Sequence, residues 1–440
     1  MSNKVAFNKD YPNIEKSEEI FKRSQGLIPS HTQTLAKGPS QFTRGVAPIY
    51  LEKGKGCHVW DVDGNEYLDY VMGVGPLSLG YNYPKVNDAI KKQLDKGIVF
   101  SLVNPLEVEV SELIKEVIPN AESVRISKTG ADVTSAAIRA ARAYTGRTKV
   151  LGCGYHGWHD WYISVTDRNK GIPEGIKQLS FTINYNDIES LEKSLDADIA
   201  CVIMEPTVFD PPKPGYLEKV KELCEKNGTV LIFDEMWTGF RLALGGAQEY
   251  FGVTPDLATY SKACANGMPV AFITGKKEIM QVFENDVFFY TTFGGEALSL
   301  AACKATIEVM KEKKVQEYLF AKGKVLKQGI LDLIKKHDIS YLNLIGFEPR
   351  TLLIIDGSAG NVLEIKSLMQ QEMIKRGILW AGYHNISFSH TDKDIDYTLK
   401  VYDEVLPIVK KAVADGNVRE QLKGEPVSAV FKRVGQPKVN

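Results

Sequence analysis

The segment between residues 124 and 274 alternates short apolar runs with helical patterns, and this alternation constrains the fold more than any other feature. Parallel strands need long crossover connections, so the pattern predicts an α/β fold with a large, mostly parallel sheet covered by helices on both faces. The predicted strands are 124–126, 149–152, 199–204, 230–234, 258–260 and 270–274, and the predicted helices include 134–144 and 217–226.

The flanking sequence predicts a smaller α+β domain. A chain of 440 residues is too long for one small core. Strands around the turn Asp63-Gly64-Asn65 form a predicted hairpin, and helical patterns return after residue 300. We predict an N-terminal arm with part of the small domain at 1–58, a large ligand-binding domain at 59–298, and a C-terminal small domain at 299–440.

The composition argues against several classes of protein. The 54 Lys and Arg residues nearly balance the 55 Asp and Glu residues, and no basic stretch stands out, so a nucleic-acid partner is not expected. No apolar run is long enough to cross a bilayer, and the N-terminus lacks a signal-peptide pattern. The 6 cysteines are scattered without a CxxC pair, as in proteins with reduced thiols. We therefore expect a cytoplasmic protein.

The residues that follow each predicted strand are candidates for a functional site, because ligands bind outside the carboxyl ends of strands in an open α/β sheet. The first strand is followed by Thr129, Gly130 and Ala131 at the start of an Ala-rich helix. Small residues there leave backbone N–H groups free at the positive end of the helix dipole, which suits a phosphate. A plain helix cap by Thr129 or Asp132 is the alternative.

The next three strands end in aromatic or acidic residues. Tyr155 and His156 follow the second strand, and aromatic rings there could stack on a flat ligand. Glu205 follows the third strand, and Asp234 ends the fourth. A buried carboxylate is costly unless a cation pairs with it, and a protonated pyridine nitrogen is one such cation. A helix cap or an ion pair with Arg241 is the alternative for Asp234.

Lys262 follows the strand 258–260 and precedes a run of small residues. Desolvation penalises an ammonium group, so such a lysine is easier to deprotonate, and its neutral amine can attack an aldehyde. An ordinary surface lysine is the alternative for this stretch alone. A phosphate cradle, a stacking aromatic, a buried carboxylate and a strand-end lysine together are what pyridoxal 5′-phosphate requires.

Five motifs extend this pattern over most of the chain: Trp60–Asn65, Ala141–Arg147, Tyr155–Gly157, Phe233–Glu235 with Thr238–Arg241, and Pro255–Lys262 with Gly267–Pro269. With them the chain resembles the class III (subgroup II) aminotransferases, which are pyridoxal 5′-phosphate enzymes of fold type I. Within that family it looks most similar to glutamate-1-semialdehyde 2,1-aminomutase and its aminotransferase relatives. The resemblance runs from about residue 28 to about residue 394.

The resemblance implies a role for each candidate residue. Lys262 would form the internal aldimine and then move a proton between the substrate carbon and the cofactor, and Asp234 would keep the pyridine nitrogen protonated. Thr292 would reach the phosphate from the neighbouring subunit, which implies a homodimer with shared active sites. The other implied cofactor contacts are Thr129, Gly130 and Ala131 at the phosphate, Tyr155 and Met236 on the two ring faces, and Glu205 near the ring hydroxyl.

Two departures from the family pattern leave the substrate open. Where the aminomutase has an arginine for the substrate carboxylate, this chain has the segment 34–37, and Lys37 is a poorer fork for a carboxylate. Where the aminomutase has a glutamate, this chain has His384. Lys37, His384 and Asn385 are therefore the candidate substrate residues, and a structural role is the alternative for His384.

These observations favour an aminotransferase that moves an amino group from a small-molecule donor to a keto or aldehyde acceptor, for example a sugar-like one. An intramolecular aminomutase of the glutamate-1-semialdehyde type is the alternative. A nicotinamide oxidoreductase is disfavoured because no GxGxxG motif follows the first predicted strand.

Overall fold

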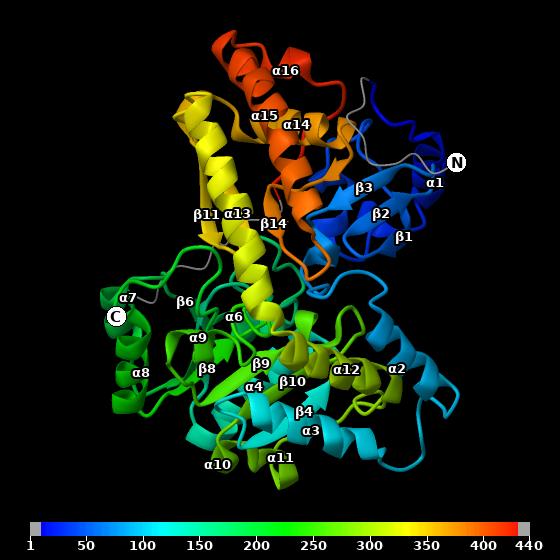
Figure 1. Cartoon of the computed structure of the whole chain (residues 1–440). Helices are drawn as coiled ribbons and strands as arrows, with labels where there is room; N and C mark the ends of the chain where they lie inside the picture. The colour runs from blue at the N-terminus through cyan, green and yellow to red at the C-terminus, as the bar shows by residue number, and fades with distance from the viewer. Residues whose placement is uncertain (1–9, 430–440) are drawn as a thin grey trace. The chain divides into compact units, whose positions relative to one another are not determined.

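The computed structural model describes residues 10–429, which form two compact units. Among the described residues, the first unit combines the N-terminal segment up to Tyr83 with the segment from Glu317 onward, and the second unit is the continuous segment Pro84–Gln316. In Figure 1 the first unit is drawn mainly in blue and in yellow to red, and the second unit runs from blue-cyan through green to yellow. Each unit has its own sheet structure.

The second unit is built on a seven-stranded sheet with the order β4-β10-β9-β8-β7-β5-β6. Neighbouring strands are parallel except at β10, which runs antiparallel to both β4 and β9. This sheet confirms the α/β architecture expected from the alternating pattern. Its strands are β4 (Ser123–Ser127), β5 (Lys149–Cys153), β6 (Ser180–Thr182), β7 (Ile199–Met204), β8 (Val230–Asp234), β9 (Leu257–Tyr260) and β10 (Ala271–Gly275).

The central strands of this sheet are apolar on both faces because helices cover them. Every residue of β7, β8, β9 and β10 is buried, as expected for strands inside a layered sheet. Helix α4 (Gly130–Thr145) packs against β7, β9 and β10, and its buried face includes Ala136, Ala137, Ala140 and Ala141. Small side chains let the helix backbone approach the sheet closely. Because α4 begins three residues after β4 ends, its start lies at the edge of the sheet where β4 ends.

Several other helices complete the second unit (Figure 1). The long helix α12 packs against α2, α3 and the short 3₁₀ helix η5. The helices are α2 (Pro84–Leu94), α3 (Pro105–Val117), α5 (Asp160–Ile163), α6 (Glu174–Lys177), α7 (Ile188–Ser194), α8 (Tyr216–Asn227), α9 (Ala247–Phe251), η5 (Lys262–Ala265), α10 (Lys277–Met280), α11 (Val282–Asn285) and α12 (Ala297–Lys313).

The first unit has two small sheets, with the orders β1-β2-β3-β13 and β11-β12-β14. Its strands are β1 (Leu51–Lys55), β2 (His58–Asp61), β3 (Glu66–Asp69), β11 (Leu342–Phe347), β12 (Arg350–Ile355), β13 (Ile378–Leu379) and β14 (Tyr383–Asn385). Its α-helices are α1 (Glu15–Ser24), α13 (Val315–Lys336), which begins two residues before the unit, α14 (Val362–Lys375), α15 (Asp392–Ala414) and α16 (Val418–Gln421). Its 3₁₀ helices are η1 (Pro29–His31), η2 (Leu35–Lys37), η3 (Pro39–Gln41), η4 (Met72–Val74) and η6 (Gly357–Ala359).

The limits of the two units differ from the predicted domain limits at 58/59 and 298/299. Strand β3 pairs in parallel with β13, so the predicted hairpin belongs with the C-terminal part of the chain. Helix α12 belongs with the second unit because it packs on α2 and α3. Long-range pairing decides both limits, and local periodicity does not report it.

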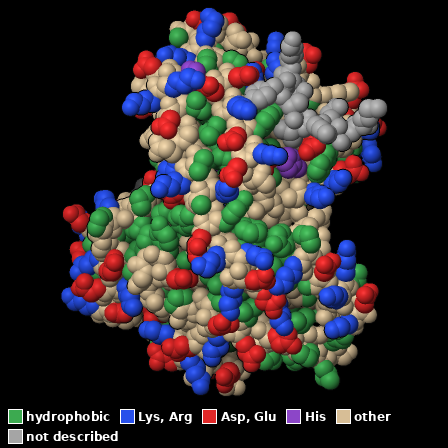
Figure 2. Space-filling model, in the orientation of Figure 1, with side chains coloured by type: hydrophobic (Ala, Val, Ile, Leu, Met, Phe, Trp, Pro, Cys, Tyr) green, Lys and Arg blue, Asp and Glu red, His purple; other side chains and the backbone are tan. Residues whose placement is uncertain are grey.

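Charges of both signs are interspersed on the face of the molecule drawn in Figure 2. This distribution agrees with the near-zero formal charge of the chain, which is −1. Among the residues that the structure describes, no helix is long and apolar enough to cross a membrane. All six cysteines are free and buried.

Candidate active site

Asp234 is buried at the carboxyl end of β8 and pairs with a histidine from another strand end. Its Oδ2 lies 2.8 Å from Nδ1 of His156, and its Oδ1 accepts the backbone N–H of Met236 at 3.1 Å. Nε2 of His156 has no hydrogen-bond partner within residues 10–429. The imidazole therefore holds one carboxylate oxygen of Asp234 in place, and the pair is closed off from water.

Lys262 lies at the same edge of the sheet, two residues after the end of the neighbouring parallel strand β9. Asp234 is in register with Thr259, three residues before Lys262. Lys262 has a φ of 41°, in the left-handed region that non-glycine residues seldom occupy, and it begins η5. Its Nζ lies 3.6 Å from the ring centroid of Trp237, which follows Asp234 by three residues. The indole thus covers the amine that the sequence singled out.

Glu205 is a second buried carboxyl group at this edge. Its Oε2 accepts the backbone N–H of Tyr155 at 2.8 Å. Burial raises the pKa of the Glu205 carboxyl, the charge of Asp234 raises it further, and the charges of His156 and Lys262 oppose the rise. These interactions place Glu205, Asp234, His156 and Lys262 in one electrostatic cluster, as expected for a functional site.

The start of α4 offers unpaired backbone donors. Thr129 and Asp132 cap each other: the Thr129 N–H donates to Asp132 Oδ2 at 2.9 Å, and the Asp132 N–H donates to Thr129 Oγ1 at 3.2 Å. The helix-cap alternative is therefore present in the structure. It leaves the N–H groups of Gly130 and Ala131 without an acceptor in the helix, so capping and anion binding are compatible.

Three loops meet tightly around this helix start. A Cβ on Gly130 would lie 2.9 Å from Met236 Sδ, and a Cβ on Gly157 would lie 2.8 Å from the Cβ of Ala131. Gly157 also has a φ of +101°, which side chains rarely adopt. The loops after β4, β5 and β8 can approach one another this closely only because glycine stands at these contacts.

Tyr155 presents its ring beside the cluster. Its side chain is 43% exposed, and its ring meets Tyr162 edge-on at a centroid distance of 5.4 Å. The hydroxyl of Tyr162 donates to the carbonyl of Gly154 at 2.8 Å and so braces the loop. An aromatic ring at this position, partly exposed and held at its edge, suits stacking on a flat ligand.

The donor set at this sheet edge fits pyridoxal 5′-phosphate. Free N–H groups of Gly130 and Ala131 suit the phosphate, the buried carboxylate of Asp234 suits a protonated ring nitrogen, and the amine of Lys262 suits the aldehyde. The unpaired buried Nε2 of His156 shows that the polar network is not closed by the described residues alone. These groups define a site at the edge of an α/β sheet that suits a cofactor for reactions of amines.

Comparison with known proteins identifies the class. The family described as "Aminotransferase class-III" matches residues 41–346. A 3-aminobutyryl-CoA aminotransferase from Cloacimonas acidaminovorans is 36% identical over 412 residues, which cover 90% of this chain and 98% of that protein. A glutamate-1-semialdehyde 2,1-aminomutase from Brevibacillus brevis is 35% identical over 421 residues, with 88% and 97% covered.

The chain therefore belongs to the class-III aminotransferases and is a pyridoxal 5′-phosphate enzyme. Among solved structures, the internal aldimine form of the FumI protein from Sphingopyxis sp. MTA144 has a TM-score of 0.86. That chain is 24% identical to this one, and the superposition covers 94% of this chain and 99% of the other. The match shows the same overall fold, as the sequence motifs predicted.

The predicted substrate residues lie in the first unit. Lys37 ends the short helix η2 and is exposed. His384 is fully buried, with Nδ1 2.9 Å from Thr351 Oγ1 and Nε2 2.9 Å from the hydroxyl of Tyr402. Burial lowers the pKa of His384 to about 3, so the imidazole is neutral. With both ring nitrogens engaged, the geometry favours the structural alternative for His384.

Asn385 is also buried and supports a neighbouring segment. Its Nδ2 donates to the carbonyl of Val71 at 2.9 Å, and its backbone N–H donates to the carbonyl of Tyr70 at 3.0 Å. Its Oδ1 has no hydrogen-bond partner in the part of the chain that the structure describes. Asn385 thus keeps one polar atom for a further donor, and its role toward a substrate stays a prediction.

Sequence reasoning missed two features of the site. The sequence predicts only a stacking role for the ring of His156, but in the structure its imidazole pairs with the carboxylate of Asp234, 78 residues away in the chain. Trp237 carried no signal beyond its place in the motif after Asp234, yet its ring covers the amine of Lys262. The first pair joins the segments after β5 and β8, which β7 separates in the sheet, and the second joins the segments after the neighbouring strands β8 and β9, so only the strand order brings these side chains together.

Glu235, next to Asp234, has a structural role. Its carboxylate accepts the N–H groups of Ala247 at 2.8 Å and Gln248 at 2.9 Å, as well as the hydroxyl of Thr238. Burial raises the pKa of Glu235 to about 7, against the effect of these donors. The residue fastens the loop after β8 to the start of α9.

This shift predicts a pH dependence of stability. Because the folded state holds the Glu235 proton up to about pH 7 and the unfolded chain releases it near 4.5, this group loses stabilising effect as the pH rises through that window. Wild type should lose stability over this interval and Glu235→Gln should not. The unfolding free energy of Glu235→Gln minus that of wild type should therefore rise by about 3 kcal/mol from pH 5 to pH 8. Urea unfolding of both proteins at the two pH values measures the change, and parallel pH profiles would contradict the shift.

Proposed function

We propose that the chain catalyses intermolecular amino transfer, with Lys262, Asp234 and the start of α4 as its working parts. The observation that carries this proposal is the meeting of the Lys262 amine and the Asp234–His156 pair at the carboxyl ends of β9 and β8. When bound, pyridoxal 5′-phosphate supplies an aldehyde and a ring that accepts electrons.

The residues of the chain bind the cofactor and orient it. The N–H groups of Gly130 and Ala131 bind the phosphate, together with the dipole of α4, and Thr129 keeps that helix start in shape. Asp234, held by His156, keeps a proton on the ring nitrogen. Tyr155 and Met236 would hold the ring of the cofactor, and the Glu205 carboxylate orients the Tyr155 loop by accepting the backbone N–H of Tyr155.

Lys262 acts at two points of the reaction. Its Nζ would hold the cofactor through the aldehyde, and the same amine would move the proton at the substrate carbon. Trp237 lies over Nζ and would attract the ammonium form of Lys262 through the face of its indole ring.

A substrate without a free carboxylate next to the reacting carbon fits this chain best. The chain has Lys37 in place of the arginine that the aminomutases use for a carboxylate, and His384 is engaged by Thr351 and Tyr402. The name of the Cloacimonas acidaminovorans relative states a thioester substrate, 3-aminobutyryl-CoA, whose acid group is masked. We propose an amino compound of this kind as donor and a separate keto or aldehyde compound as acceptor.

The aminomutase reaction remains the second candidate because the relative from Brevibacillus brevis is 35% identical.

Purified enzyme should be yellow and lose that colour when an amino donor is added. A screen of 3-aminobutyryl-CoA and free amino acids as donors, with 2-oxo acids as acceptors, tests transfer by detecting the new amino product. Isomerisation of glutamate-1-semialdehyde without any second compound would support the aminomutase instead, and a colourless protein that takes up no cofactor would refute both.

We further propose a homodimer in which Thr292 completes the partner's phosphate site. Thr292 is exposed, and the segment around it joins the segment near residue 98 through a hydrogen bond from Ala297 N–H to the carbonyl of Ile98 at 2.9 Å. These two segments expose large apolar side chains, which a second copy of the chain would cover. They are Val99, Phe100, Leu102, Val103, Phe288, Tyr290 and Phe293. We expect this dimer to work in the cytoplasm.

Phe293→Asp is expected to convert the dimer to monomers, because it places a charge in the apolar surface that the second copy covers. The mass in solution, measured by light scattering, should fall from two chains to one. Val325→Asp is the matched control, since Val325 is also about half exposed but lies on α13 in the first unit. A wild-type protein that is already monomeric, or a Phe293→Asp variant that stays dimeric, would contradict the proposed interface.

A further inference from the structure

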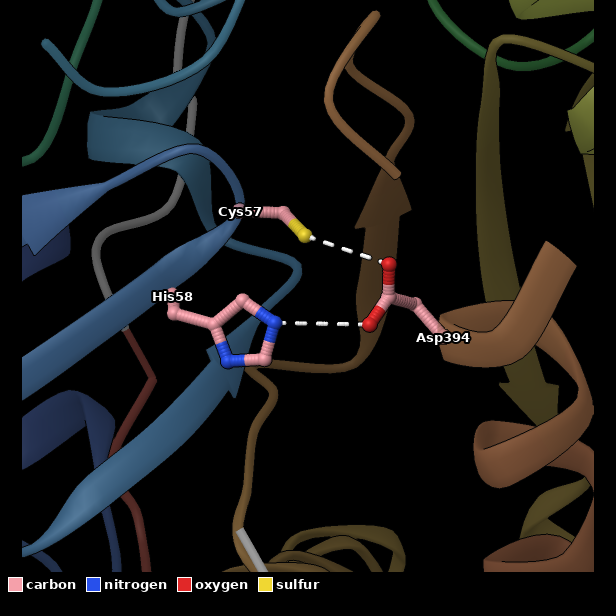
Figure 3. Close-up of side chains that lie close together, drawn as sticks. All are labelled: Cys57, His58 and Asp394. Carbon is pink, nitrogen blue, oxygen red and sulfur yellow. Dashed lines mark hydrogen bonds and ion pairs between the residues drawn. The ribbon is translucent and has the colours of Figure 1, made fainter. Parts of the chain in front are cut away.

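Cys57, His58 and Asp394 form a cluster of metal-ligand side chains within the first unit (Figure 3). Sγ of Cys57 lies 3.6 Å from Asp394 Oδ2, and Nε2 of His58 lies 3.3 Å from Asp394 Oδ1. One candidate ligand atom from each residue lies within 4.8 Å of the other two. Within residues 10–429 this is the one group of three such side chains that could hold a metal ion.

The local backbone explains how neighbouring residues reach one point. Consecutive side chains in a strand point to opposite faces of the sheet. Cys57, however, lies in the turn before β2, after Gly56 with a φ of +62°, and His58 is the first residue of β2. The turn rotates the thiol, so both side chains face the Asp394 carboxylate, as Figure 3 shows.

The donors match zinc in type and spacing. Zinc takes thiolate, imidazole and carboxylate ligands at about 2.0–2.3 Å in a tetrahedron, which separates ligand atoms by about 3.3–3.8 Å. Cys57 Sγ lies 3.6 Å from Asp394 Oδ2 and His58 Nε2 lies 3.3 Å from Asp394 Oδ1, so the two distances resemble this spacing although they end on different oxygens of the carboxylate. A sulfur donor disfavours calcium and magnesium, which prefer oxygen ligands.

The surroundings hold the donors in a suitable state. Oε1 of Glu66 lies 3.0 Å from Nδ1 of His58, an ion-pair distance without hydrogen-bond geometry, and Nε2 of His58 faces the cluster. A carboxylate near the second ring nitrogen is frequent around metal-bound histidine. Thr391 donates its N–H and its hydroxyl to Asp394 Oδ2, each at 2.7 Å. These bonds fix the carboxylate and leave its Oδ1 with His58 as its partner on the cluster side.

The Cys57 thiol has two acceptors within hydrogen-bond distance. Its Sγ lies 3.3 Å from the carbonyl oxygen of Ser389 and 3.6 Å from Asp394 Oδ2. Zinc binds the thiolate and not the thiol, so binding of the ion would release the proton that Cys57 donates to these oxygens.

We propose that Cys57, His58 and Asp394 bind one zinc ion, with a water molecule at the fourth position. His58 and Asp394 side chains are 28% and 15% exposed, so the ion can enter from solvent. The ion joins the β1–β2 turn to the first turn of α15, across a sequence separation of 337 residues between Cys57 and Asp394. Zinc therefore stabilises the first unit by linking these two segments, and it takes no part in the chemistry at Lys262.

Zinc titration of the pyridoxal 5′-phosphate-loaded enzyme by calorimetry tests the proposal. We expect one zinc ion per chain and a zinc-dependent rise in the midpoint of thermal unfolding. Cys57→Ala and Asp394→Asn should lose the site, and the asparagine variant keeps an oxygen that can accept the Thr391 N–H. Glu66→Gln should weaken zinc binding about 10- to 100-fold, as loss of an outer-shell partner does. Cobalt in place of zinc should give a thiolate-to-metal absorption band that Cys57→Ala abolishes.

Cys224→Ala is the matched control, because Cys224 is another buried thiol, on helix α8 of the second unit, and should leave zinc binding unchanged. Wild-type enzyme that binds no zinc, or binds it as tightly after Cys57→Ala as before, would overturn the proposal. If Cys57→Ala folds poorly, Glu66→Gln and Asp394→Asn still decide the question, because unchanged affinity in both would overturn it as well.

Discussion

Lys262→Ala is expected to lower the turnover number by several orders of magnitude and to leave the cofactor loosely held. The variant removes both the amine that binds the cofactor aldehyde and the base that moves the proton at the substrate carbon. The position of Nζ, 3.6 Å from the Trp237 ring and beside the Asp234 strand end, makes it the one amine that the proposed reaction uses. Steady-state kinetics with the donor found in the screen, together with cofactor content after dialysis, measures both effects.

Lys276→Ala is the control for this experiment. Lys276 also directly follows a strand, but β10 is antiparallel to β9, so its end lies at the opposite edge of the sheet. Its Nζ pairs there with Asp256 at 2.6 Å. We expect Lys276→Ala to retain the cofactor and its turnover. Near-normal turnover of Lys262→Ala would mean that another lysine does the chemistry.

Asp234→Asn is expected to lower kcat/KM by about 10²- to 10³-fold, the usual scale for the loss of one preorganised electrostatic contact. The amide has the shape of the carboxylate and can keep the hydrogen bond with the Met236 N–H. It cannot supply the negative charge that keeps a proton on the ring nitrogen. The expected signature is a loss mainly in kcat, with a pH-dependent change in the absorbance of the bound cofactor.

Glu235→Gln is the matched control for Asp234→Asn, because it neutralises the adjacent residue. Glu235 is engaged with Thr238, Ala247 and Gln248, so this variant should change the pH dependence of stability and leave the cofactor spectrum unaltered. An Asp234→Asn enzyme whose kcat/KM stays within about threefold of wild type would show that the ring nitrogen does not depend on this carboxylate.

The zinc proposal stands apart from these experiments. The Cys57, His58 and Asp394 cluster belongs to the first unit, whereas Lys262 and Asp234 belong to the second. Loss of zinc binding in Cys57→Ala should change thermal stability, and loss of Lys262 should change turnover. A protein that fails one test can therefore pass the other.

Much of the fold was predictable because strand and helix signals are local. The apolar runs that become β7 and β8 and the Ala-rich run that becomes α4 carry their structure in their spacing and composition. The positions of Glu205, Asp234 and Lys262 at strand ends followed directly from those runs. The domain limits did not follow, because the pairing of β3 with β13 joins residues more than 300 positions apart.

The order of residues along the chain thus determined that this is an α/β protein with a lysine and two carboxylates at strand ends. Tertiary structure alone decided which side chains meet there: His156 with Asp234, Trp237 with Lys262, and Cys57 with Asp394. The physical reason is that the spacing of apolar residues along a segment indicates which face of that segment is buried, but not which distant segment covers it. Contacts between strand ends depend on strand order and register, which are set when distant segments bury their apolar faces together.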